Sequence, residues 1–236
     1  MNNKLIIFLI ISVFISSCSK DDENVLPESE LSAYELSVID YFKEVALGFE
    51  FGDASKITRK WDSKMKIFVG GSSNYELLNE LETIKNEIND LVTDGFSVEI
   101  VNDSIQSNFY IYFGSGNNYA NIFPDQSNLV GSNWGLFHVF WNSENQLYSG
   151  YMYIDIYRAN AAEQKHLLRE ELTQSLGLAK DSPRYNESIF QSSWTTTTVY
   201  AEIDKDLIRL LYHPLMTSGL NANQVEEVLI EILTTI

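Results

Sequence analysis

The stretch REELTQSLGLAKDS, residues 169 to 182, holds the side chains of this chain that are best suited to chemistry. Glu170 and Gln174 stand four residues apart, so on a helix their side chains would face the same way, one turn apart. Glu171 follows the first of them, where a carboxylate can take a proton from bound water. A zinc hydrolase helix has this spacing, with two metal ligands one turn apart and a glutamate as general base.

The stretch resembles the metzincin pattern H-E-x-x-H-x-x-G-x-x-H-D, although no histidine stands at any of the three ligand positions. The resemblance places Glu170 and Gln174 at the first two ligands and Glu171 at the general base. It places the other positions as follows: Gly177 at the helix break, Lys180 at the third ligand and Asp181 at the aspartate. The base, the glycine and the aspartate are therefore retained, and the imidazoles are not.

The resemblance continues downstream and implies a fold. The segment ESIF is similar to the methionine turn, with Phe190 in place of the methionine, and residues 203–214 are similar to the final helix. Residue by residue, the pattern E-E-x-x-Q-x-L-G-L-x-x-D-S resembles that of a secreted bacterial family of unknown function with a zincin-like domain. From this resemblance, which covers residues 165–214, we expect an α/β (α+β) fold. It would be a zincin-like mixed sheet packed on helices, with a mostly helical C-terminal subdomain.

The side chains at the ligand positions are poorly suited to catalytic zinc, which proteins hold mainly with imidazole. Gln174 offers a neutral amide oxygen, and Lys180 is protonated near neutral pH and repels a cation. We therefore expect no metal and no cofactor. Two alternatives stay open: His166 shares a helix face with Glu170 and Gln174, and oxygen ligands that include Asp181 could hold calcium or magnesium. A lone histidine on a charged helix is nevertheless expected to be solvated.

A structural interpretation competes with the site. In it, Glu170 or Glu171 pairs with a nearby cation or accepts backbone hydrogen bonds, as part of a polar seam. Gln174 would bridge to the sheet, and Asp181 would cap the turn after Gly177. The cations within reach along the chain are Arg169, Lys165 and Lys180.

The first residues predict the compartment. A lysine precedes the apolar run of residues 5–15, and ISSC follows, which resembles the lipobox of bacterial lipoproteins. We expect residues 1–17 to be a signal peptide, Cys18 to be acylated and to hold the protein on a lipid bilayer, and residues 18–30 to form a tether. SKDDE looks like an export tag, which predicts an outer-membrane lipoprotein at the cell surface. Anchorage facing the periplasm is the alternative.

Composition limits the partners. The chain has 236 residues and a formal net charge of −17, so nucleic acid is not an expected partner, because phosphate binding needs clustered cations. It has one cysteine, so no disulfide can form within the chain and stability must come from a core. We expect residues 31–236 to form one domain, with subdomains at 31–178 and 179–236.

Hydrophobic periodicity predicts the elements that position these residues. Strands dominate the middle of the chain, and the period changes from two to about 3.6 after Arg158. Leu168, Leu172 and Leu176 would form the buried side of the central helix, and Gly177 would end it in a left-handed conformation. We predict helices within 31–52, 74–95, 160–181, 204–216 and 221–236, and strands within 64–71, 96–101, 108–116, 134–142 and 147–158.

The sequence thus predicts a lipid-anchored envelope protein with a metalloprotease-like fold that has lost its zinc ligands. We expect a binding module rather than an enzyme, with a peptide, a protein or a glycan held in the former substrate cleft. Residues 163–178 would form the floor and the strand WGLFHVFW one wall, along which a peptide could add as a strand. The alternative is a hydrolase with an unusual metal and Glu171 as general base.

Overall fold

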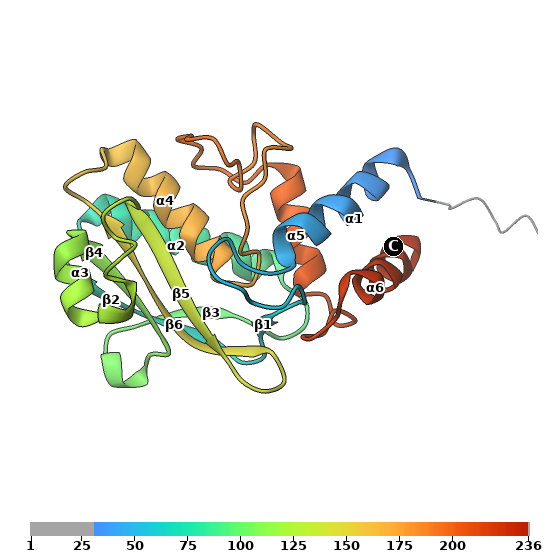
Figure 1. The fold of residues 1–236 in the computed structure, drawn as a ribbon, viewed down its shortest axis with the longest axis horizontal. Coiled ribbons are helices and arrows are strands. Elements are labelled where there is room, and N and C mark those ends of the chain that lie inside the picture. The colour runs from blue at the N-terminus through green and yellow to red at the C-terminus, as the bar shows by residue number, and fades with distance from the viewer. Residues whose placement is uncertain (1–30, 236) are drawn as a thin grey trace, which may run out of the picture. The chain divides into compact units, whose positions relative to one another are not determined.

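The computed structural model describes residues 31–235, which belong to one compact unit (Figure 1). The predicted signal peptide, Cys18 and the tether lie outside the described residues. The elements are α1 (Ala33–Ala46), β1 (Lys60–Trp61), β2 (Met65–Gly71), α2 (Tyr75–Leu91), β3 (Val98–Val101), η1 (Ser104–Gln106), β4 (Phe109–Gly114), α3 (Gly116–Ile122), η2 (Pro124–Gln126), β5 (Gly135–Trp141), β6 (Gln146–Asp155), α4 (Ala161–Gln174), α5 (Glu202–Leu211) and α6 (Ala222–Thr235).

The six strands form one mixed sheet. β3, β2, β4 and β6 follow one another in parallel, and the short β1 pairs in parallel with the start of β6. β5 is antiparallel to β6, and the turn between them contains Asn145, whose φ of 64° lies in the left-handed region. Among the described residues, β6 is the only strand partner of β5, so β5 forms an edge of the sheet.

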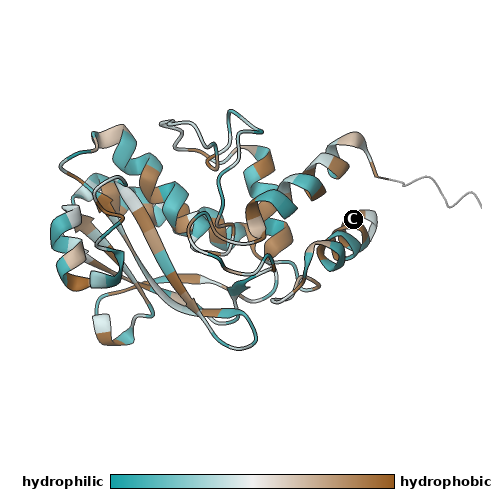
Figure 2. Cartoon of the chain, in the orientation of Figure 1, coloured by the Kyte–Doolittle hydropathy of each residue, from teal (hydrophilic) through white to brown (hydrophobic). Residues whose placement is uncertain are grey.

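The alternating pattern of β6 divides the core into two layers. Met152 and Ile154 join the main core, which α2 and α4 cover, whereas Tyr151 and Tyr153 join a smaller aromatic cluster beside α3. Figure 2 shows apolar and polar residues alternating along α4, as in a helix with one buried face. The stripe of α2 consists of Leu77, Leu81, Ile84, Ile88 and Leu91. Tyr151 and Tyr153 thus serve packing.

The helices after the sheet complete the predicted architecture. α5 and α6 follow the strands and pack with α1, which starts at a Ser32 capping box (Figure 1). A mixed sheet packed on helices, followed by a mostly helical C-terminal part, confirms the α+β fold class. Within residues 31–235, no helix has the length and hydropathy needed to cross a bilayer.

The central helix ends earlier than the sequence predicts, and the reason is the packing of its last turn. α4 stops at Gln174, and Gly177 follows with a φ of +117°. A Cβ on Gly177 would lie 1.9 Å from the carbonyl oxygen of Arg59, so only glycine lets the chain pass here. The Trp61 indole donates to the Ser175 carbonyl (3.0 Å), and the Tyr212 hydroxyl donates to the Leu176 carbonyl (2.9 Å).

Two of the short elements that were not predicted are β1 and α3. β1 has two residues, too few for a periodic signal. The predicted strand 108–116 ends at Gly114, because Ser115 caps α3 and its hydroxyl accepts a hydrogen bond from the Asn118 N–H (3.3 Å). Neither element changes the order of the layers that position the central helix.

Candidate functional site

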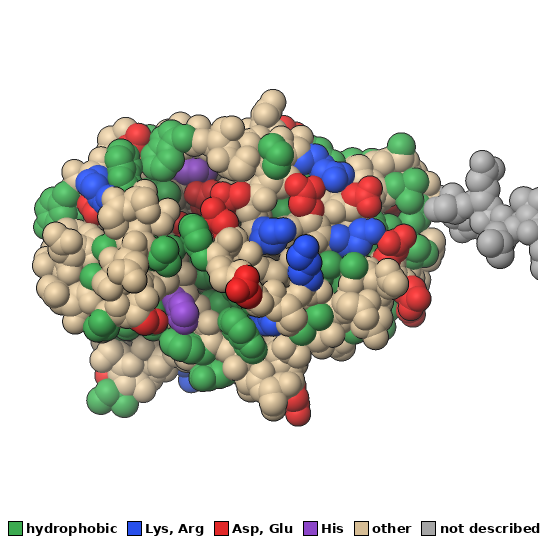
Figure 3. Space-filling view, viewed as in Figure 1, with side chains coloured by type: hydrophobic (Ala, Val, Ile, Leu, Met, Phe, Trp, Pro, Cys, Tyr) green, Lys and Arg blue, Asp and Glu red, His purple; other side chains and the backbone are tan. Residues whose placement is uncertain are grey.

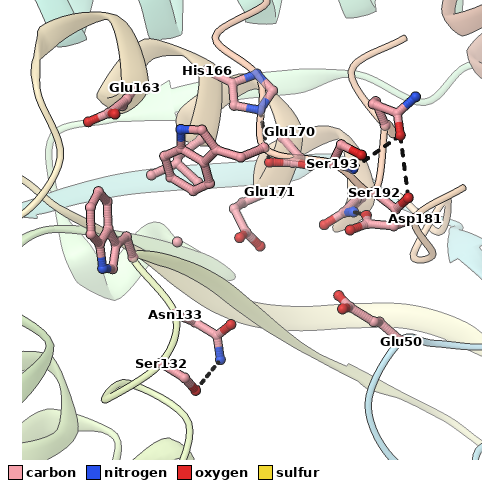
Figure 4. Close-up of a pocket in the computed structure, with 16 residues that line it drawn as sticks. Glu50, Ser132, Asn133, Glu163, His166, Glu170, Glu171, Asp181, Ser192 and Ser193 are labelled. Atoms are coloured by element: carbon pink, nitrogen blue, oxygen red, sulfur yellow. Dashed lines mark hydrogen bonds and ion pairs between the residues drawn. The ribbon is translucent and has the colours of Figure 1, made fainter. Parts of the chain in front are cut away.

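A cavity of about 590 Å³ lies beside α4, between the start of β5 and the loop after Gln191 (Figure 4). Figure 3 shows acidic side chains gathered in a hollow of this face beside a histidine, with lysine and arginine side chains to one side. Residues from distant parts of the sequence meet here. The ionisable groups that line the cavity are Glu50, Glu163, His166, Glu170, Glu171 and Asp181.

The structure brings together four of the residues that the motif singled out. Glu170, Glu171, Gln174 and Asp181 all line this cavity, whereas Gly177 forms the turn beneath the helix end. Three of the four project from α4, and the glycine turn returns Asp181 to their side. The motif therefore describes one surface of one cleft.

Two predicted cleft residues have to be corrected. Lys180 is not among the residues that line the cavity, and its aliphatic chain lies near Gly48 instead. Phe190 is fully buried in the main core. The cause is the anchoring of its segment, in which the N–H of Phe190 donates to the Ser188 hydroxyl (3.0 Å), which donates to Asp204 (2.5 Å).

Glu171 lies at the contact between α4 and the edge strand. Only 9% of the residue is exposed. A Cβ built on Gly135, the first residue of β5, would lie 2.7 Å from the Glu171 carboxylate and 3.0 Å from a methyl group of Leu167. The backbone N–H of Phe137 donates to the same carboxylate. The absence of a side chain at Gly135 thus lets Glu171 reach over the edge of the sheet.

His166 is not solvated as the sequence predicted, because the loop that follows the motif covers it. Its exposed fraction is 3%, and its Nδ1 lies 2.7 Å from the carbonyl oxygen of Thr197. Its Nε2 lies 3.3 Å from the Glu170 carboxylate and 3.3 Å from the Thr195 hydroxyl. Burial lowers the pKa of His166, so a neutral imidazole is favoured at neutral pH. The ring joins α4 to the loop over the cleft.

The polar seam forms only in part. The Gln174 amide donates to Asp181 (2.6 Å) rather than bridging to the sheet. The cations that we expected beside Glu170 and Glu171 are engaged elsewhere: Arg169 pairs with Glu80 and Glu87, Lys165 pairs with Glu76, and Lys180 lies outside the cavity. No lysine or arginine of residues 31–235 forms an ion pair with Glu170, Glu171 or Asp181.

Four carboxyl groups of the cleft repel one another. Burial, followed by the charges of Asp181 and Glu50, raises the pKa of Glu171 well above its usual value. Burial and the neighbouring acids, Glu171 first, raise the pKa of Glu170 likewise. The pKa of Asp181 is raised by burial against the opposing effect of the Gln174 hydrogen bond, and the pKa of Glu50 by burial and Asp181. The cleft therefore holds protons at pH values where exposed carboxyls have lost them.

A second cavity of about 310 Å³ continues from the first along β5. Glu50, Asn133, Gly135, Glu171 and Gln174 line both cavities, so the two form one cleft. The walls of the second cavity are mainly apolar. They include Phe49, Phe51, Leu136, Phe137, Val139 and Trp141.

The outer edge of β5 faces this cleft. The Asp155 N–H donates to the Trp134 carbonyl, so Trp134 and every second residue after it turn their backbone groups toward β6. By the alternation of an antiparallel ladder, the backbone groups of Gly135, Phe137 and Val139 point away from β6. At Phe137, Glu171 accepts from the N–H, and the Gln126 amide donates to the carbonyl (3.1 Å). Both flanking residues keep outward groups without a strand partner.

The donor set does not fit zinc. Within residues 31–235, no three side chains of the His, Cys, Asp or Glu type are grouped so as to hold a metal ion. At the motif positions, the Gln174 amide is engaged with Asp181, and Lys180 lies outside the cavity. Glu170 has only His166 beside it, so the set lacks the imidazoles that zinc hydrolases use.

Sequence reasoning included Trp134, the first residue of the predicted wall WGLFHVFW, but missed two other side chains of the cleft. Glu50 stands in the loop after α1, and Trp194 stands in the connection before α5. Their only signal was the position of a charged or aromatic residue in a connection, which carries no periodicity. Contacts across the sequence, rather than local pattern, bring them to α4.

Comparison with known proteins gives one family. No curated protein matches the chain. A solved structure of myroilysin is 11% identical in sequence, with a TM-score of 0.42 over 65% of this chain and 95% of that chain. The family described as "Protein of unknown function (DUF2927)" matches residues 36–231, most of the chain, and the protein therefore belongs to that family.

Proposed function

We propose that residues 31–235 bind an extended peptide segment of another protein in the cleft between α4 and β5. The fold would be metalloprotease-like, with the zinc ligands lost. The observation that carries the proposal is the free edge of β5, which opens onto two joined cavities at the motif residues. Added strands dock on such edges through backbone hydrogen bonds, and flanking pockets select side chains.

The backbone of β5 supports this mode of binding. Gly135 and Val139 present outward N–H and carbonyl groups, two residues apart on either side of Phe137. The side chains of Gln126 and Glu171 occupy the groups of Phe137, and an added strand would replace these two bonds. A ligand along this edge would place alternate side chains toward the polar and the apolar cavity.

The stability of the free protein also supports a binding role. Glu171 is buried and the Glu170 side chain is only 13% exposed, both close to other acids and without a lysine or arginine partner, which costs stability. A chain selected for stability alone would place a cation here or an apolar side chain. Local arrangements that reduce stability are typical of functional sites.

Peptide backbone chemistry provides the test. Acetylated, amidated heptapeptide pools would be measured for binding to the full chain, with and without N-methylation at alternate positions. Strand addition requires that methylation on the paired face abolishes binding, whereas methylation on the other face has little effect. Binding that ignores N-methylation, or no binding of any pool, would contradict the proposal.

Two matched variants test whether the peptide binds in the first cavity. Ser193→Trp would fill the first cavity from its exposed rim, and Ser104→Trp adds the same side chain at an exposed site on η1. Only the first is expected to weaken peptide binding, by at least about tenfold. If the two variants weaken peptide binding equally, the peptide does not bind in the cleft.

The sequence adds a proposed location. Through acylated Cys18, the protein would be held in the outer membrane, exposed at the cell surface, or else facing the periplasm. The lipobox-like ISSC and the following SKDDE support this part of the proposal. Labelling of cells with a palmitate analogue, compared between wild type and Cys18→Ser, would test the anchor. Protease treatment of intact cells would test the face.

A second candidate function is hydrolysis with Glu171 as general base. Its supporting observation is a buried carboxyl with a raised pKa in an open cleft, as many catalytic acids and bases have. Metal analysis and a screen for peptide cleavage, each on wild type and Glu171→Gln, decide between the two. A cleavage activity that the variant loses would replace binding as the function.

A further inference from the structure

We infer that the cavity between α4 and the Trp134–Trp194 pair selects a cationic side chain, a guanidinium or an alkylammonium group, on the bound peptide. This inference rests on the proposed peptide binding and specifies the ligand of the same cleft. Three independent features of the cavity carry it: the sign of its charge, an unpaired buried carboxyl, and two indole rings.

The charge of the cavity has one sign. Five carboxyl side chains line it, and no lysine or arginine does. Three of the carboxyls project from α4, and Glu50 and Asp181 approach from other segments (Figure 4). A neutral ligand would cover these carboxyls and leave them repelling one another, whereas a cation would neutralise them in the same place.

Glu171 lacks the partner that a buried carboxylate requires. It is 9% exposed, and Figure 4 shows its carboxylate directed into the open space between Asn133 and Glu50. Its one hydrogen-bond donor in the described chain is the backbone N–H of Phe137, which leaves capacity for at least one strong donor. Guanidinium and ammonium groups supply such donors together with the opposite charge.

Two tryptophans supply the aromatic part of the site. Their rings meet edge to face with centroids 5.3 Å apart, and both line the cavity. The guanidinium carbon of Arg158 already lies 5.9 Å from the Trp134 ring, which shows that this ring accepts a cation on a face. Trp194 is 58% exposed and keeps a face for a ligand. Indole rings are the best cation acceptors among side chains.

The same features favour an organic cation over a metal ion. Calcium needs six to eight oxygen ligands that converge on one point. Residues 31–235 contain no group of three acidic or imidazole side chains arranged to hold a metal. The aliphatic stem of arginine or lysine would pack on Leu167 and Trp194, which also line the cavity.

A binding experiment with isosteric peptides tests the inference. Heptapeptide pools would carry arginine, lysine, citrulline or glutamate at the central position and random residues elsewhere, and each pool would be titrated into the full chain. Citrulline has nearly the shape of arginine without its charge. We expect the arginine and lysine pools to bind at least about tenfold more tightly than the citrulline pool, and the glutamate pool to bind least.

Variants of cavity residues test whether the preference for arginine over citrulline arises in this cavity. Glu171→Gln should reduce the arginine-to-citrulline ratio about tenfold, and Trp194→Leu should reduce it about threefold to tenfold, because leucine keeps apolar contact without a π face. Glu227→Gln changes the net charge equally on the exposed side of α6 and should leave the ratio unchanged.

The outcomes separate this inference from the proposed function. Equal binding of all four pools would overturn the cation preference and leave peptide binding intact. A preference for glutamate, or a ratio that Glu171→Gln does not change, would also overturn it. No binding of any pool would remove the proposed function itself. Tight binding of Ca²⁺ or Zn²⁺ alone, competing with the arginine pool, would assign the carboxyls to a metal instead.

Discussion

The side-chain amide of Gln174 donates a 2.6 Å hydrogen bond to the carboxylate of Asp181 across the turn that ends α4. These two residues stand at the second ligand and at the aspartate of the motif, and here they bond to each other. The bond fixes the amide with its nitrogen toward Asp181, so Gln174 holds the geometry of the cleft wall. One turn earlier, Glu170 lies beside His166 and Glu171 accepts from the Phe137 N–H, and both line the open cavity.

We predict that Gly135→Ala destabilises the protein. The new Cβ would lie 2.7 Å from the Glu171 carboxylate and 3.0 Å from Leu167, so α4 must move away from the edge strand. Overpacking of this kind costs about 1–3 kcal/mol of unfolding free energy, measurable by urea denaturation. Gly131→Ala is the control, because nothing lies within 4 Å of its Cβ position. Equal stability of the two variants would show that α4 and β5 are not in close contact.

Gly177→Ala should be more damaging than the same change at Gly95. Both glycines have a left-handed φ, +117° and +94°, so alanine is strained at each by about 1 kcal/mol. At Gly177 the Cβ would also meet the Arg59 carbonyl at 1.9 Å, whereas the space beside Gly95 is open. We expect Gly177→Ala to cost at least about 3 kcal/mol by thermal or urea unfolding. Similar losses at both positions would contradict the close passage of the chain.

Glu171→Gln should stabilise the protein at neutral pH. The folded-state pKa of Glu171 is raised, so ionisation of the buried group costs stability as the pH rises above the unfolded value of 4.5. The amide has no such cost, and the gain should be roughly 1 kcal/mol or more at pH 8. It should shrink as the pH falls through 4.5 and vanish about one pH unit below it, where wild-type Glu171 is protonated in both states. Thermal unfolding across this pH range, with Glu227→Gln as the exposed control, checks the sign.

Arg169→Ala should destabilise strongly, because it removes a buried cation from the partly buried Glu80 and the more exposed Glu87. Arg169 is 1% exposed, donates to Glu80 (2.8 Å) and to Glu87, and lies over the Tyr200 ring with its guanidinium carbon 4.5 Å from the centroid. Removing one partner of a buried pair costs about 3–5 kcal/mol. Arg209→Ala removes an exposed pair with Asp206 and should cost less than about 1 kcal/mol. A small effect at Arg169 would show that water reaches these acids.

Binding of the arginine peptide pool should strengthen from pH 5 to pH 8. Burial raises the pKa values of Glu50, Glu170, Glu171 and Asp181, so protons compete with a cationic ligand across this range. The remaining ionisable groups of the cavity are His166, whose protonation at low pH would repel the ligand further, and Glu163. Titration calorimetry at several pH values measures the slope. Binding of the citrulline pool should not depend on pH in this way. Equal slopes for the two pools would contradict the electrostatic explanation.

The candidate site was predictable where it depends on helix periodicity and was not where it depends on loops. The spacing of Glu170, Glu171 and Gln174 placed them correctly on one side of α4. Phe190 was assigned wrongly to the cleft, because the hydrogen bonds of Ser188 and Asp204 turn it into the core. Ser188 and Asp204 are separated along the chain, and no local sequence pattern predicts that they form a hydrogen bond.

The sequence alone determined the helices and strands, the break at Gly177 and the set of polar residues on one side of the central helix. These follow from local periodicity and from the conformational freedom of glycine, which the neighbouring residues largely decide. Only the tertiary structure decided that Glu171 lies over Gly135, that Arg169 pairs with acidic residues of α2, and that Glu50 and Trp194 complete the cavity. Those contacts join segments far apart in the chain, and their partners are selected by the packing of the whole domain.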